Sequence, residues 1–435
     1  MKRITRRHFL AAGIAVGASS AVDATLAELM PRSRGRRVVI VGGGWGGLTA
    51  ARYLRDLAPE LEVVLVERSA TFRSLPLSNK WLAGLAPEAG AGYSYLAAAR
   101  AYGYTFIQDE ATAIDRERRR VITRGGTLDY DWLVLAVGIR YDYAPWFGDD
   151  RRAADQARQS FPAGFVADEL DALKRKLAGF QGGDFVMTIP PAPYRCTPAP
   201  YERAVMIAWL FKQKNIKGRL IVVDPGAGMQ AFNRVFADRY KDWIVHLTHA
   251  NVKSIDPFSK TIVTEFDDLR FDDGMLMPAQ QAGDLAWQAG LIARDSDGRA
   301  TGWGALDPIH LHARDDDRVF LVGDLIDKVS PLFGFYPKSG HLANRLGRIA
   351  AREIAARARG ELPEPLLPES ICHVFPDVEP LERIRIDAQY RLRGDGIIAQ
   401  TVRQHYDPQP RGEDVEWAQS MYADFLVPGG GPAAQ

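Results

Sequence analysis

The sequence predicts an α/β protein with two Rossmann-like dinucleotide-binding domains and a C-terminal α+β domain. A strand, a turn, a helix and a second strand follow one another from Arg37 to Glu67, and again from Asp184 to Asp224. This order produces parallel strands joined by a helical crossover. The segment after residue 368 instead mixes short strand patterns with one helix. A chain of 435 residues has room for two or three such domains.

The charge of the chain is nearly balanced, because 55 Lys and Arg residues stand against 54 Asp and Glu residues. A net charge of +1 gives no reason to expect nucleic acid or acidic lipid as a partner. No internal apolar run reaches the roughly 20 residues that a membrane-spanning helix needs. We therefore expect no transmembrane segment in the mature chain.

Residues 1–32 are predicted to be a twin-arginine signal peptide and spacer outside the fold. The motif Thr5–Leu10 contains the arginine pair, and the apolar run Ala11–Val22 that follows lacks polar periodicity. A basic amphipathic first helix is the alternative. This export route carries folded proteins, so we expect a periplasmic protein that is loaded with its cofactor in the cytoplasm. Cleavage could follow Ala21 or Ala27, and a disulfide is permitted in that compartment.

The first unit has the pattern of a dinucleotide-binding site. Strand Arg37–Val41 leads into a glycine-rich turn, the helix Leu48–Leu57 and the strand Glu62–Val66. The spacing G-x-G-x-x-G is supplied by Gly42, Gly44 and Gly47. The first glycine allows a tight turn, the second lets the backbone approach a pyrophosphate, and the third lets the helix pack on the strand. Glu67 then stands where an acidic side chain accepts ribose hydroxyls. A purely structural glycine turn is the alternative.

Two later strands favour FAD over NAD as the ligand of the first unit. Tyr130–Leu135 and Arg318–Val322 each end in a short motif similar to those that complete FAD domains. The motif residues are Ala136 and Gly138 after the first strand, and Gly323 and Asp324 after the second. Each motif alone also fits an ordinary strand end. When both motifs follow the glycine turn in this order, the combination is specific for an FAD-binding domain.

The FAD-binding domain is expected to be split along the sequence. The expected ranges are 36–150 and 291–360 for the FAD-binding domain, 151–290 for the second domain with Cys196, 361–427 for the C-terminal domain with Cys372, and 428–435 for a disordered tail. Arg151–Pro162 is polar and is predicted to be an irregular crossover. The proline-rich segment Glu361–Pro368 leads to the C-terminal domain. There we predict strands Ile384–Tyr390 and Gly396–Gln404 and the helix Val415–Tyr422.

The second unit lacks the glycines that a phosphate-binding loop needs. Strand Asp184–Ile189, helix Tyr201–Lys214 and strand Arg219–Val223 keep the topology, but the loop Pro190–Cys196 reads PPAPYRC. Proline has no N–H donor, and without glycine the backbone cannot closely approach a pyrophosphate. The sequence Gly226–Ala231 fits G-x-G-x-x-A but follows the second strand of the unit, so it is predicted to be a turn. We therefore expect no productive NAD(P)H binding.

The chain has only two cysteines, Cys196 and Cys372. In an exported protein two cysteines most simply form one disulfide. A structural staple between the second domain and the C-terminal region is one role for it, and a reactive pair is the other. Cys196 precedes the helix Tyr201–Lys214, whose N-terminal dipole stabilises a thiolate. Its position favours the reactive role.

Five segments carry a resemblance to a known family: Pro190–Glu202, Leu77–Asn79, Gly323-Asp324, Pro337–Gly340 and Ile371-Cys372. They resemble the flavoprotein subunit of flavocytochrome c sulfide dehydrogenase, within the sulfide:quinone reductase-like flavoproteins. The resemblance covers essentially all of the mature chain. It implies a glutathione reductase-like arrangement in which the C-terminal domain is an interface domain. It also implies a redox-active disulfide between the two cysteines, next to the flavin.

The resemblance further implies a reaction. Sulfide or a related small inorganic sulfur species would attack the Cys196–Cys372 disulfide, and electrons would pass to FAD and then to a c-type cytochrome. Glu202 stands six positions after Cys196, where the family has a proton acceptor. An ordinary glutamate in the first turn of a helix is the alternative.

Three further residues are expected at the cofactor. Asp324 matches the family acid that binds the ribityl chain, and Asn79 belongs to the Leu-Ser-Asn motif of the FAD site. Lys338 precedes the helix His341–Arg357, whose N-terminus by resemblance points at N1 and O2 of the flavin. Lys338 would add full charge there, both as a cofactor contact and as a catalytic group. A solvated lysine is the alternative.

The sequence departs from many family members in its cofactor attachment. Leu75 stands two residues before the Leu-Ser-Asn motif, at the position of the cysteine that attaches FAD, so FAD is expected to be non-covalent. No C-x-x-C-H motif occurs, so any haem belongs to a separate cytochrome. A sulfide:quinone oxidoreductase is the alternative, although no amphipathic membrane-binding helix is apparent near the C-terminus. A flavoprotein with a purely structural disulfide is the third reading.

Several other side chains are expected to have structural roles. The histidines do not form a convincing ligand set, so no metal is predicted. Those considered are His246, His249, His310 and His312. Trp417 and Tyr422 are expected to pack in the core rather than line a partner surface.

Overall fold

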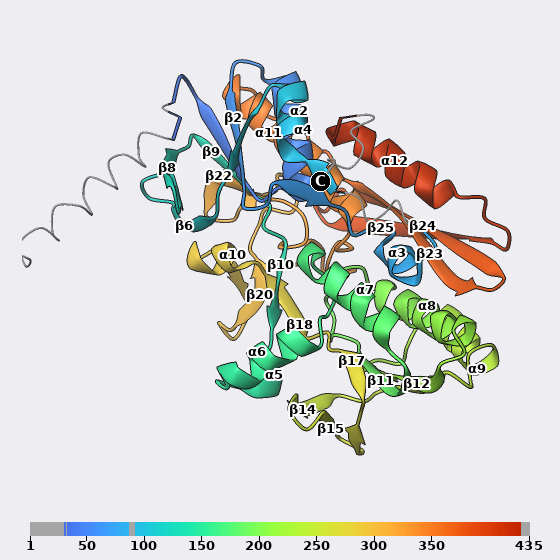
Figure 1. The fold of residues 1–435 in the computed structure, drawn as a ribbon. Coiled ribbons are helices and arrows are strands. Elements are labelled where there is room, and N and C mark those ends of the chain that lie inside the picture. Colours follow the sequence, from blue (N-terminus) through green and yellow to red (C-terminus); the bar gives the residue numbers. More distant parts are fainter. Residues whose placement is uncertain (1–29, 32, 87–91, 428–435) are drawn as a thin grey trace, which may run out of the picture.

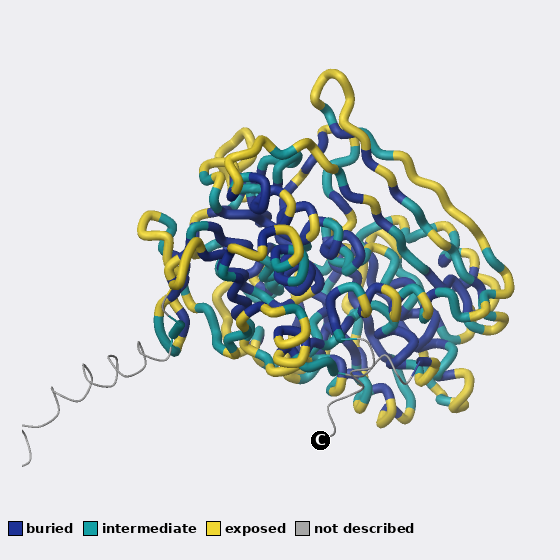
Figure 2. The backbone as a smooth tube through the Cα atoms, turned by 90° about the horizontal axis from the view of Figure 1, so that it is seen from above, coloured by how far each residue is buried: buried dark blue, intermediate teal, exposed yellow. Residues whose placement is uncertain are grey.

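The structure, a computed structural model, describes residues 30–31, 33–86 and 92–427. The predicted signal peptide, apart from the end of its spacer, and the predicted disordered tail lie outside the described residues. Figure 1 shows two α/β parts, one above the other, with a C-terminal sheet beside them. In Figure 2 the buried backbone is concentrated inside, and the exposed segments are mostly loops at the periphery.

The first sheet has six strands, whose order in space differs from their order along the chain. From edge to edge they are β21 (His312–Ala313), β22 (Asp316–Leu321), β9 (Trp132–Leu135), β1 (Arg37–Val41), β2 (Glu62–Glu67) and β5 (Thr105–Gln108). All neighbouring pairs are parallel except β21 and β22. Every residue of β1 is buried, which is typical of a parallel strand covered on both faces. Because β22 pairs with β9, the chain returns to this sheet after building the second one.

Helix α2 (Trp45–Leu57) packs against helix α11 (Gly340–Ala358) beside the first sheet (Figure 1). A Cβ atom on Gly347 would lie 2.3 Å from the carbonyl oxygen of Gly46, so the contact requires glycine. Helix α2 begins at Trp45, three residues before the predicted start at Leu48. Glycine is a poor helix former, but here close packing favours Gly46 and Gly47 inside the first turn.

The second sheet has four parallel strands. Their order is β13 (Ile244–Leu247), β12 (Lys217–Val223), β11 (Gly182–Thr188) and β17 (Asp273–Met275). Helix α8 (Ala199–Gln213) joins β11 to β12, and helix α9 (Gln230–Asp238) joins β12 to β13. The start of the segment Gly226–Ala231 is a turn before α9, as predicted. The predicted α/β fold class is therefore confirmed in both units.

The segment predicted to be an irregular crossover is a helix, α6 (Arg151–Ser160). The carboxylate of Asp150 caps it by accepting a hydrogen bond from the Ala153 amide at 3.0 Å. Its buried residues are Ala153 and Ala157. The prediction was wrong because a helix that buries only alanine shows little apolar periodicity.

The C-terminal region forms an antiparallel sheet of three strands followed by a helix. The elements are β23 (Glu369–Val378), β24 (Leu381–Leu392), β25 (Ile398–Asp407) and α12 (Glu413–Phe425). The two strands and the helix that were predicted here are longer than expected, and β23 is an additional strand that carries Cys372. Strand β23 packs against α8 of the second unit. Within the described residues, no helix combines the length and the apolar character that crossing a bilayer requires.

The remaining elements surround or connect these sheets. An antiparallel pair, β10 with β18, joins the two α/β parts where the chain passes between them. The elements are β3 (Thr71–Arg73), α3 (Ser78–Ala83), β4 (Gly92–Ser94), α4 (Tyr95–Tyr102), β6 (Ala111–Asp115), β7 (Arg120–Thr123), β8 (Gly126–Asp129), β10 (Ile139–Asp142), α5 (Ala144–Phe147), a 3-10 turn (Ala167–Glu169), α7 (Leu170–Gly179), β14 (Val252–Asp256), β15 (Thr261–Thr264), β16 (Asp268–Arg270), β18 (Ala279–Ala282), α10 (Asp284–Gln288), β19 (Ile292–Arg294) and β20 (Ala300–Gly304).

Candidate active site

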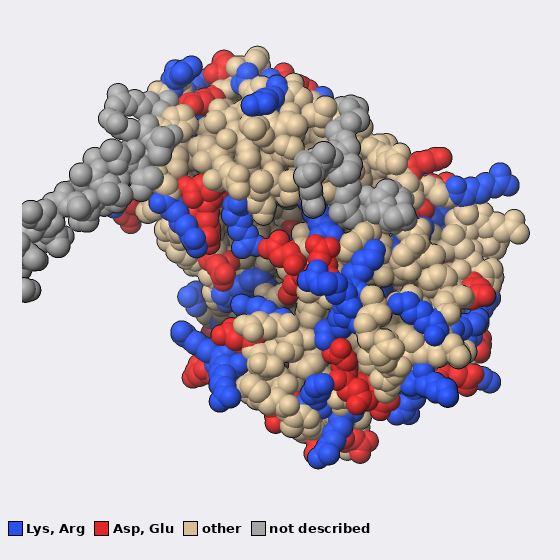
Figure 3. Space-filling model, viewed as in Figure 1, with Lys and Arg blue, Asp and Glu red and all other residues tan. Residues whose placement is uncertain are grey.

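A cavity of about 750 Å³ lies where the two α/β parts and the C-terminal sheet meet. Figure 3 shows a hollow between the upper and lower parts, with acidic and basic side chains gathered around it. Two ion pairs on the cavity wall connect the two parts: Arg68 with Asp168 at 3.0 Å and Arg73 with Asp171 at 2.7 Å. The cavity is therefore an inter-domain site, the usual place for a cofactor.

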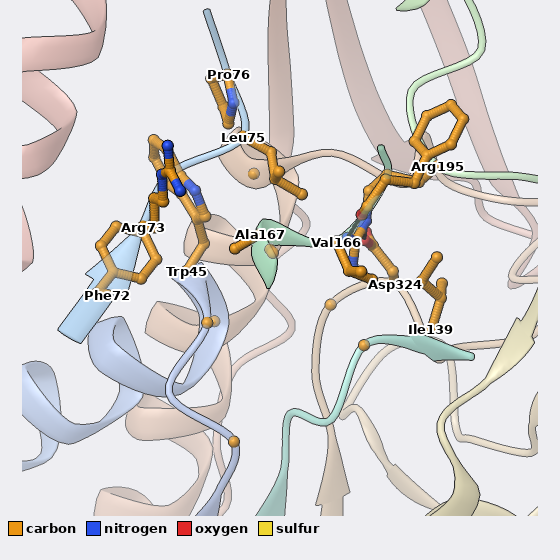
Figure 4. Close-up of a pocket in the computed structure, with 18 of the residues that line it drawn as sticks. Trp45, Phe72, Arg73, Leu75, Pro76, Ile139, Val166, Ala167, Arg195 and Asp324 are labelled. Atoms are coloured by element: carbon orange, nitrogen blue, oxygen red, sulfur yellow. Dashed lines mark hydrogen bonds and ion pairs between the residues drawn. The ribbon is translucent and has the colours of Figure 1, made fainter. Parts of the chain in front are cut away.

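Most of the predicted site residues meet in this cavity, although they come from segments far apart in the sequence. Those on its wall are Gly42, Gly44, Glu67, Leu75, Asn79, Ala136, Gly138, Cys196, Glu202, Gly323, Asp324 and Cys372. Gly47 and Lys338 are not among the lining residues. Figure 4 shows Trp45, Phe72 and Arg73 on one side of the cavity and Arg195 with Asp324 on the other.

The glycine turn after β1 has the shape that a pyrophosphate requires. Gly42 has φ +101°, and a Cβ atom there would lie 2.5 Å from the carbonyl oxygen of Ala136. A Cβ atom on Gly47 would lie only 1.9 Å from the carbonyl oxygen of Gly42, so Gly47 shapes the turn from behind. Around Gly44 there is open space. The N-terminus of α2 has no side-chain cap, which leaves its amide groups available to an anion.

Glu67, at the end of β2, faces the glycine turn. Its carboxylate accepts hydrogen bonds from the amides of Gly43 at 2.8 Å and Ser69 at 3.0 Å. The indole N–H groups of Trp45 and Trp417, also on the cavity wall, are buried and have no hydrogen-bond partner within the described part of the chain. A glycine turn open to the cavity, an adjacent carboxylate and unpaired buried donors fit a bound dinucleotide such as FAD.

Asp324 is paired with an arginine that the sequence reasoning did not single out. Arg195 Nε lies 2.5 Å from the Asp324 carboxylate, and Arg195 Nη1 donates to the carbonyl oxygen of Phe165 at 2.5 Å (Figure 4). Arg195 immediately precedes Cys196, so this ion pair connects the cysteine loop to the end of β22. Its position inside the proline-rich motif was the only sequence signal.

Lys338 contacts backbone carbonyl groups and an aromatic ring. Its ammonium group is buried, donates to the carbonyl oxygens of Asp324 at 2.7 Å and Ile326 at 2.9 Å, and lies 3.6 Å from the centroid of the Trp303 ring. Burial lowers the pKa of Lys338 to about 7. The expected approach of this ammonium group to the cofactor ring stays a prediction. Lys338 holds the backbone after β22, and its own carbonyl accepts the amide of Cys196 at 2.8 Å.

Cys196 and Cys372 lie together on the cavity wall. Cys196 stands before α8 with φ +52°, and Cys372 lies within β23, opposite Ile386. Both are free cysteines here, and the disulfide stays a prediction. The pKa of the Cys372 thiol is raised well above its ordinary value by its hydrogen bond with Cys196, by burial and by the charge of Glu202. The structure thus brings together two thiols that lie 176 positions apart in the sequence.

Glu202 is half-buried beside the cysteines and is held by two donors. Its Oε2 accepts from Asn79 Nδ2 at 2.7 Å, and its Oε1 accepts from the amide of Phe375 at 3.1 Å. Burial raises the pKa of Glu202 to about 7, against the opposing effect of these hydrogen bonds and of the nearby Lys80 charge. A carboxylate with this pKa can gain or lose a proton near neutral pH.

Two further buried cations near Glu202 were not predicted. Arg203 donates to Asn79 Oδ1 at 2.7 Å and to the carbonyl oxygens of Ala163 and Gly164, each at 3.0 Å. Lys80 forms a buried ion pair with Asp414 at 2.7 Å. Each cation directly follows a residue that the motifs had singled out, but no local pattern shows that its charge is buried and paired.

An aromatic wall encloses the other side of the cavity. The rings of Trp45 and Trp417 are stacked at 6.3 Å with an interplanar angle of 17°. His341 and His373 contact Trp417 at 5.9 and 5.5 Å between centroids. Burial lowers the pKa of His341 to about 3 and that of His373 to about 4, so both imidazoles are neutral at pH 7. Trp417 is therefore a cavity residue in addition to a packing residue.

The end of β12 differs from a nucleotide-binding strand end. Asp224 is buried and accepts hydrogen bonds from the Tyr201 hydroxyl at 2.9 Å and the Gly226 amide at 2.7 Å, and pairs with His246 at 2.9 Å. Its carboxylate is therefore occupied by the protein itself. The absence of NAD(P)H binding in this unit stays a prediction.

Comparisons with known proteins match two parts of the chain to family models. The model described as "Sulfide dehydrogenase (flavocytochrome c) flavoprotein chain, central" matches residues 170–275. The model "Pyridine nucleotide-disulphide oxidoreductase" matches residues 36–176. The first of these lies on the second α/β unit, which contains Cys196 and Glu202.

Curated relatives fall in the same group. The sulfide-quinone reductase of Aquifex aeolicus is 25% identical over 288 residues, covering 59% of this chain and 61% of its own length. The mitochondrial sulfide:quinone oxidoreductase of Mus musculus is 22% identical, covering 66% of this chain and 65% of its own length. The match thus spans less than two thirds of either relative. The flavoprotein chain of flavocytochrome c sulfide dehydrogenase from Chlorobaculum thiosulfatiphilum is 52% identical over 44 residues, covering 10% of this chain and 92% of its own length.

A solved structure shares the fold. The sulfide:quinone oxidoreductase of the hyperthermophilic bacterium Aquifex aeolicus superimposes with a TM-score of 0.70 at 19% identity, covering 91% of this chain and 93% of that one. Pyridine nucleotide-disulphide oxidoreductases of this kind imply FAD as the cofactor. By its matches, its fold and the contents of its cavity, the chain belongs to the sulfide:quinone reductase-like flavoproteins, which include the flavoprotein chain of flavocytochrome c sulfide dehydrogenase.

Proposed function

We propose that the protein is an FAD-dependent oxidoreductase that oxidises sulfide through a redox-active disulfide and passes the electrons to a c-type cytochrome. The observation that carries the proposal is the contact between Cys196 and Cys372 on the cavity wall, next to a buried carboxylate whose pKa is about 7. A purely structural disulfide needs neither the cavity nor Glu202.

The residues of the first unit would hold FAD. The amides of Gly44, Trp45 and Gly46 at the N-terminus of α2 would bind the pyrophosphate, and Glu67 the adenosine ribose. Asp324 would face the ribityl chain, in which case its present bond to Arg195 must open or be shared. When bound, FAD supplies an acceptor for a pair of electrons. Leu75, an alkyl side chain on the cavity wall, supports non-covalent attachment.

The proposed chemistry begins with the disulfide oxidised. Hydrosulfide attacks one sulfur of the Cys196–Cys372 bond, so that a new S–S bond forms as a persulfide while the old bond breaks and the other cysteine leaves as a thiolate. The proton of the attacking group passes to the carboxylate of Glu202. The net change is HS⁻ to S⁰ and H⁺, with two electrons going to FAD.

The proposal also has to choose the electron acceptor, which is either a c-type cytochrome or a quinone. The match to the sulfide dehydrogenase central region supports a cytochrome on a separate chain, whereas the curated relatives from Aquifex aeolicus and Mus musculus are named for quinone. Quinone therefore stays the second candidate. The sulfide-reduced protein can be mixed with oxidised cytochrome c or with a water-soluble quinone, and the rate of flavin reoxidation measured. Faster reoxidation by cytochrome c supports the cytochrome, and faster reoxidation by the quinone supports the second candidate.

The compartment is proposed from the sequence alone. The motif Thr5–Leu10 and the apolar run after it support export through the twin-arginine route to the periplasm. Replacing Arg6 and Arg7 with Lys is expected to leave the protein in the cytoplasm. Cell fractionation would detect it, and unchanged export of the variant contradicts the proposal.

Anaerobic rapid mixing tests the reaction. Sulfide is expected to bleach the flavin absorbance of the wild-type protein within seconds, and Cys196→Ser and Cys372→Ser are expected to abolish bleaching. NADH is expected to leave the absorbance unchanged. Wild-type rates in Cys196→Ser would refute the disulfide route, and rapid bleaching by NADH would refute the interpretation of the proline loop.

A further inference from the structure

Three separate elements meet at the carboxylate of Glu202. Helix α8 carries Glu202 itself, helix α3 brings Asn79 to Oε2, and strand β23 brings the amide of Phe375 to Oε1 at 3.1 Å. Phe375 lies three residues after Cys372 on the same strand. Both oxygens therefore face a donor. A hydrogen bond donated to the charged carboxylate is stronger than one donated to the neutral acid, so the geometry favours the charged form, which is able to accept a proton.

The orientation of the Asn79 amide follows from its partners. Arg203 Nε can only donate, so the oxygen of the amide must face it, at 2.7 Å. The carbonyl oxygen of Ala199 can only accept, so the NH₂ group must face it, at 3.0 Å, and this places the same NH₂ group 2.7 Å from Glu202. A flipped amide would set an oxygen against two acceptors and a nitrogen against a donor.

Arg203 is itself fixed. Its two terminal nitrogens donate to the carbonyl oxygens of Ala163 and Gly164, each at 3.0 Å. Only 2% of the residue is exposed, so it has no rotamer that reaches water without breaking these bonds. The chain of donors from Arg203 through Asn79 to Glu202 therefore has one direction, and every hydrogen in it points toward the carboxylate.

We propose that Asn79 and Arg203 are positioning residues for Glu202: Arg203 locks the amide of Asn79 in the one orientation that donates to Glu202 and so keeps this carboxylate ready to accept the proton of the sulfur substrate. The catalytic meaning of this arrangement rests on the proposed function, whereas the effect on Glu202 does not. Neither residue needs to touch the substrate or the cofactor in this role. The side-chain amide of Asn79 is hydrogen-bonded to Glu202, Ala199 and Arg203, and its expected contact with the cofactor stays a prediction.

The test measures the protonation of Glu202 directly in the FAD-loaded protein without substrate. Infrared difference spectra between pH values contain a band of the protonated carboxyl group that Glu202→Gln removes. In the wild type its midpoint is expected near pH 7. Asn79→Ala removes one hydrogen bond to the charged form, and the midpoint is expected to rise by about 1 to 2 pH units. In Asn79→Asp a second carboxylate faces Glu202, and the rise is expected to be larger still.

Two further variants complete the design. Arg203→Lys keeps a positive charge but loses the planar fork that fixes the amide, so a smaller rise is expected. The matched control is Asn251→Ala, because Asn251 Nδ2 donates to Glu265 at 2.6 Å in the same way at an exposed site. This control is expected to leave the titration of Glu202 unchanged. Far-UV circular dichroism and flavin absorbance identify variants that fail to fold, and Asn79→Asp keeps the acceptor for Arg203 if Asn79→Ala does not fold.

The outcomes separate the two proposals. Folded Asn79→Ala and Asn79→Asp proteins with the wild-type midpoint would overturn the positioning role, even if sulfide still reduces the flavin. A raised midpoint in a protein that sulfide does not reduce would keep the positioning role and refute the proposed function. If both proposals hold, the pH profile of flavin reduction by sulfide shifts with the infrared midpoint. The titration of sulfide itself is common to all variants and cancels.

Discussion

The buried Glu202 carboxylate is expected to make the stability of the protein depend on pH. Burial raises its pKa from 4.5 to about 7 in the folded state, whereas the unfolded chain keeps the ordinary value. Between these pH values the folded state holds a proton that the unfolded state has lost, so the free energy of unfolding falls as pH rises. A difference of about 2.5 pH units corresponds to a loss of ~3 kcal/mol, complete above pH 7.

The variant Glu202→Gln isolates this effect. Glutamine does not titrate, so the loss between pH 4.5 and 7 disappears from the variant. Its amide meets a donor on both sides and gives up one hydrogen bond, but that cost is the same at every pH. We therefore expect the free energy of unfolding of Glu202→Gln, relative to the wild type, to rise by ~3 kcal/mol from pH 4.5 to 8.

Urea unfolding of both proteins at several pH values, followed by tryptophan and flavin fluorescence, measures the difference. The control is Glu265→Gln, because Glu265 is exposed and its pKa is lowered by the hydrogen bond from Asn251. The contribution of Glu265 to the free energy of unfolding is therefore present above its ordinary pKa and is lost as pH falls. This pH dependence has the opposite sign to that expected for Glu202. Parallel pH curves for wild type and Glu202→Gln would refute the reasoning.

Three other changes test other parts of the site. Lys80→Met leaves Asp414 charged and buried and is expected to destabilise the protein by about 3 to 5 kcal/mol; urea unfolding measures this, and a loss below 1 kcal/mol contradicts it. Gly47→Ala places a Cβ atom 1.9 Å from a loop carbonyl oxygen and is expected to lower the FAD content, read as flavin absorbance per protein; full occupancy contradicts it. In the reduced protein, iodoacetamide is expected to label Cys196 well before Cys372, because the pKa of Cys372 is raised; mass spectrometry measures the order, and faster labelling of Cys372 contradicts it.

The elements that the sequence predicted well are those with strong local patterns. The strands around Val39 and Val186 are continuous β-branched and apolar runs, and the glycine turn after the first has a fixed spacing. Helix α6 was missed because its buried face is alanine. Strand β23 was missed as a strand because its side chains face partners on two sides, so it shows no simple alternation of apolar and polar residues.

The motifs identified Cys196, Glu202 and Asp324, which the structure places on the cavity wall, and their roles there stay predictions. The hydrogen-bond network of the site was not predictable, because it depends on contacts between residues more than 100 positions apart. The bond from Asn79 to Glu202 is of this kind. The burial of Lys338 was missed for another reason, since Asp324 and Ile326, which accept its hydrogen bonds, lie only 14 and 12 positions away. From sequence, a lysine just before a helix is predicted to be solvated or to bind an anion. Only the fold shows that backbone carbonyls already accept the hydrogen bonds of its ammonium group.

The chemistry of the cavity is completed by the last part of the chain to be synthesised. The first sheet is completed by β21 and β22, and the second sulfur arrives only with β23. A nascent chain therefore holds Cys196 on a nearly finished scaffold while its partner is still being translated. Assembly of the thiol pair therefore requires translation to reach the C-terminal sheet, and a product that ended before β23 would lack Cys372.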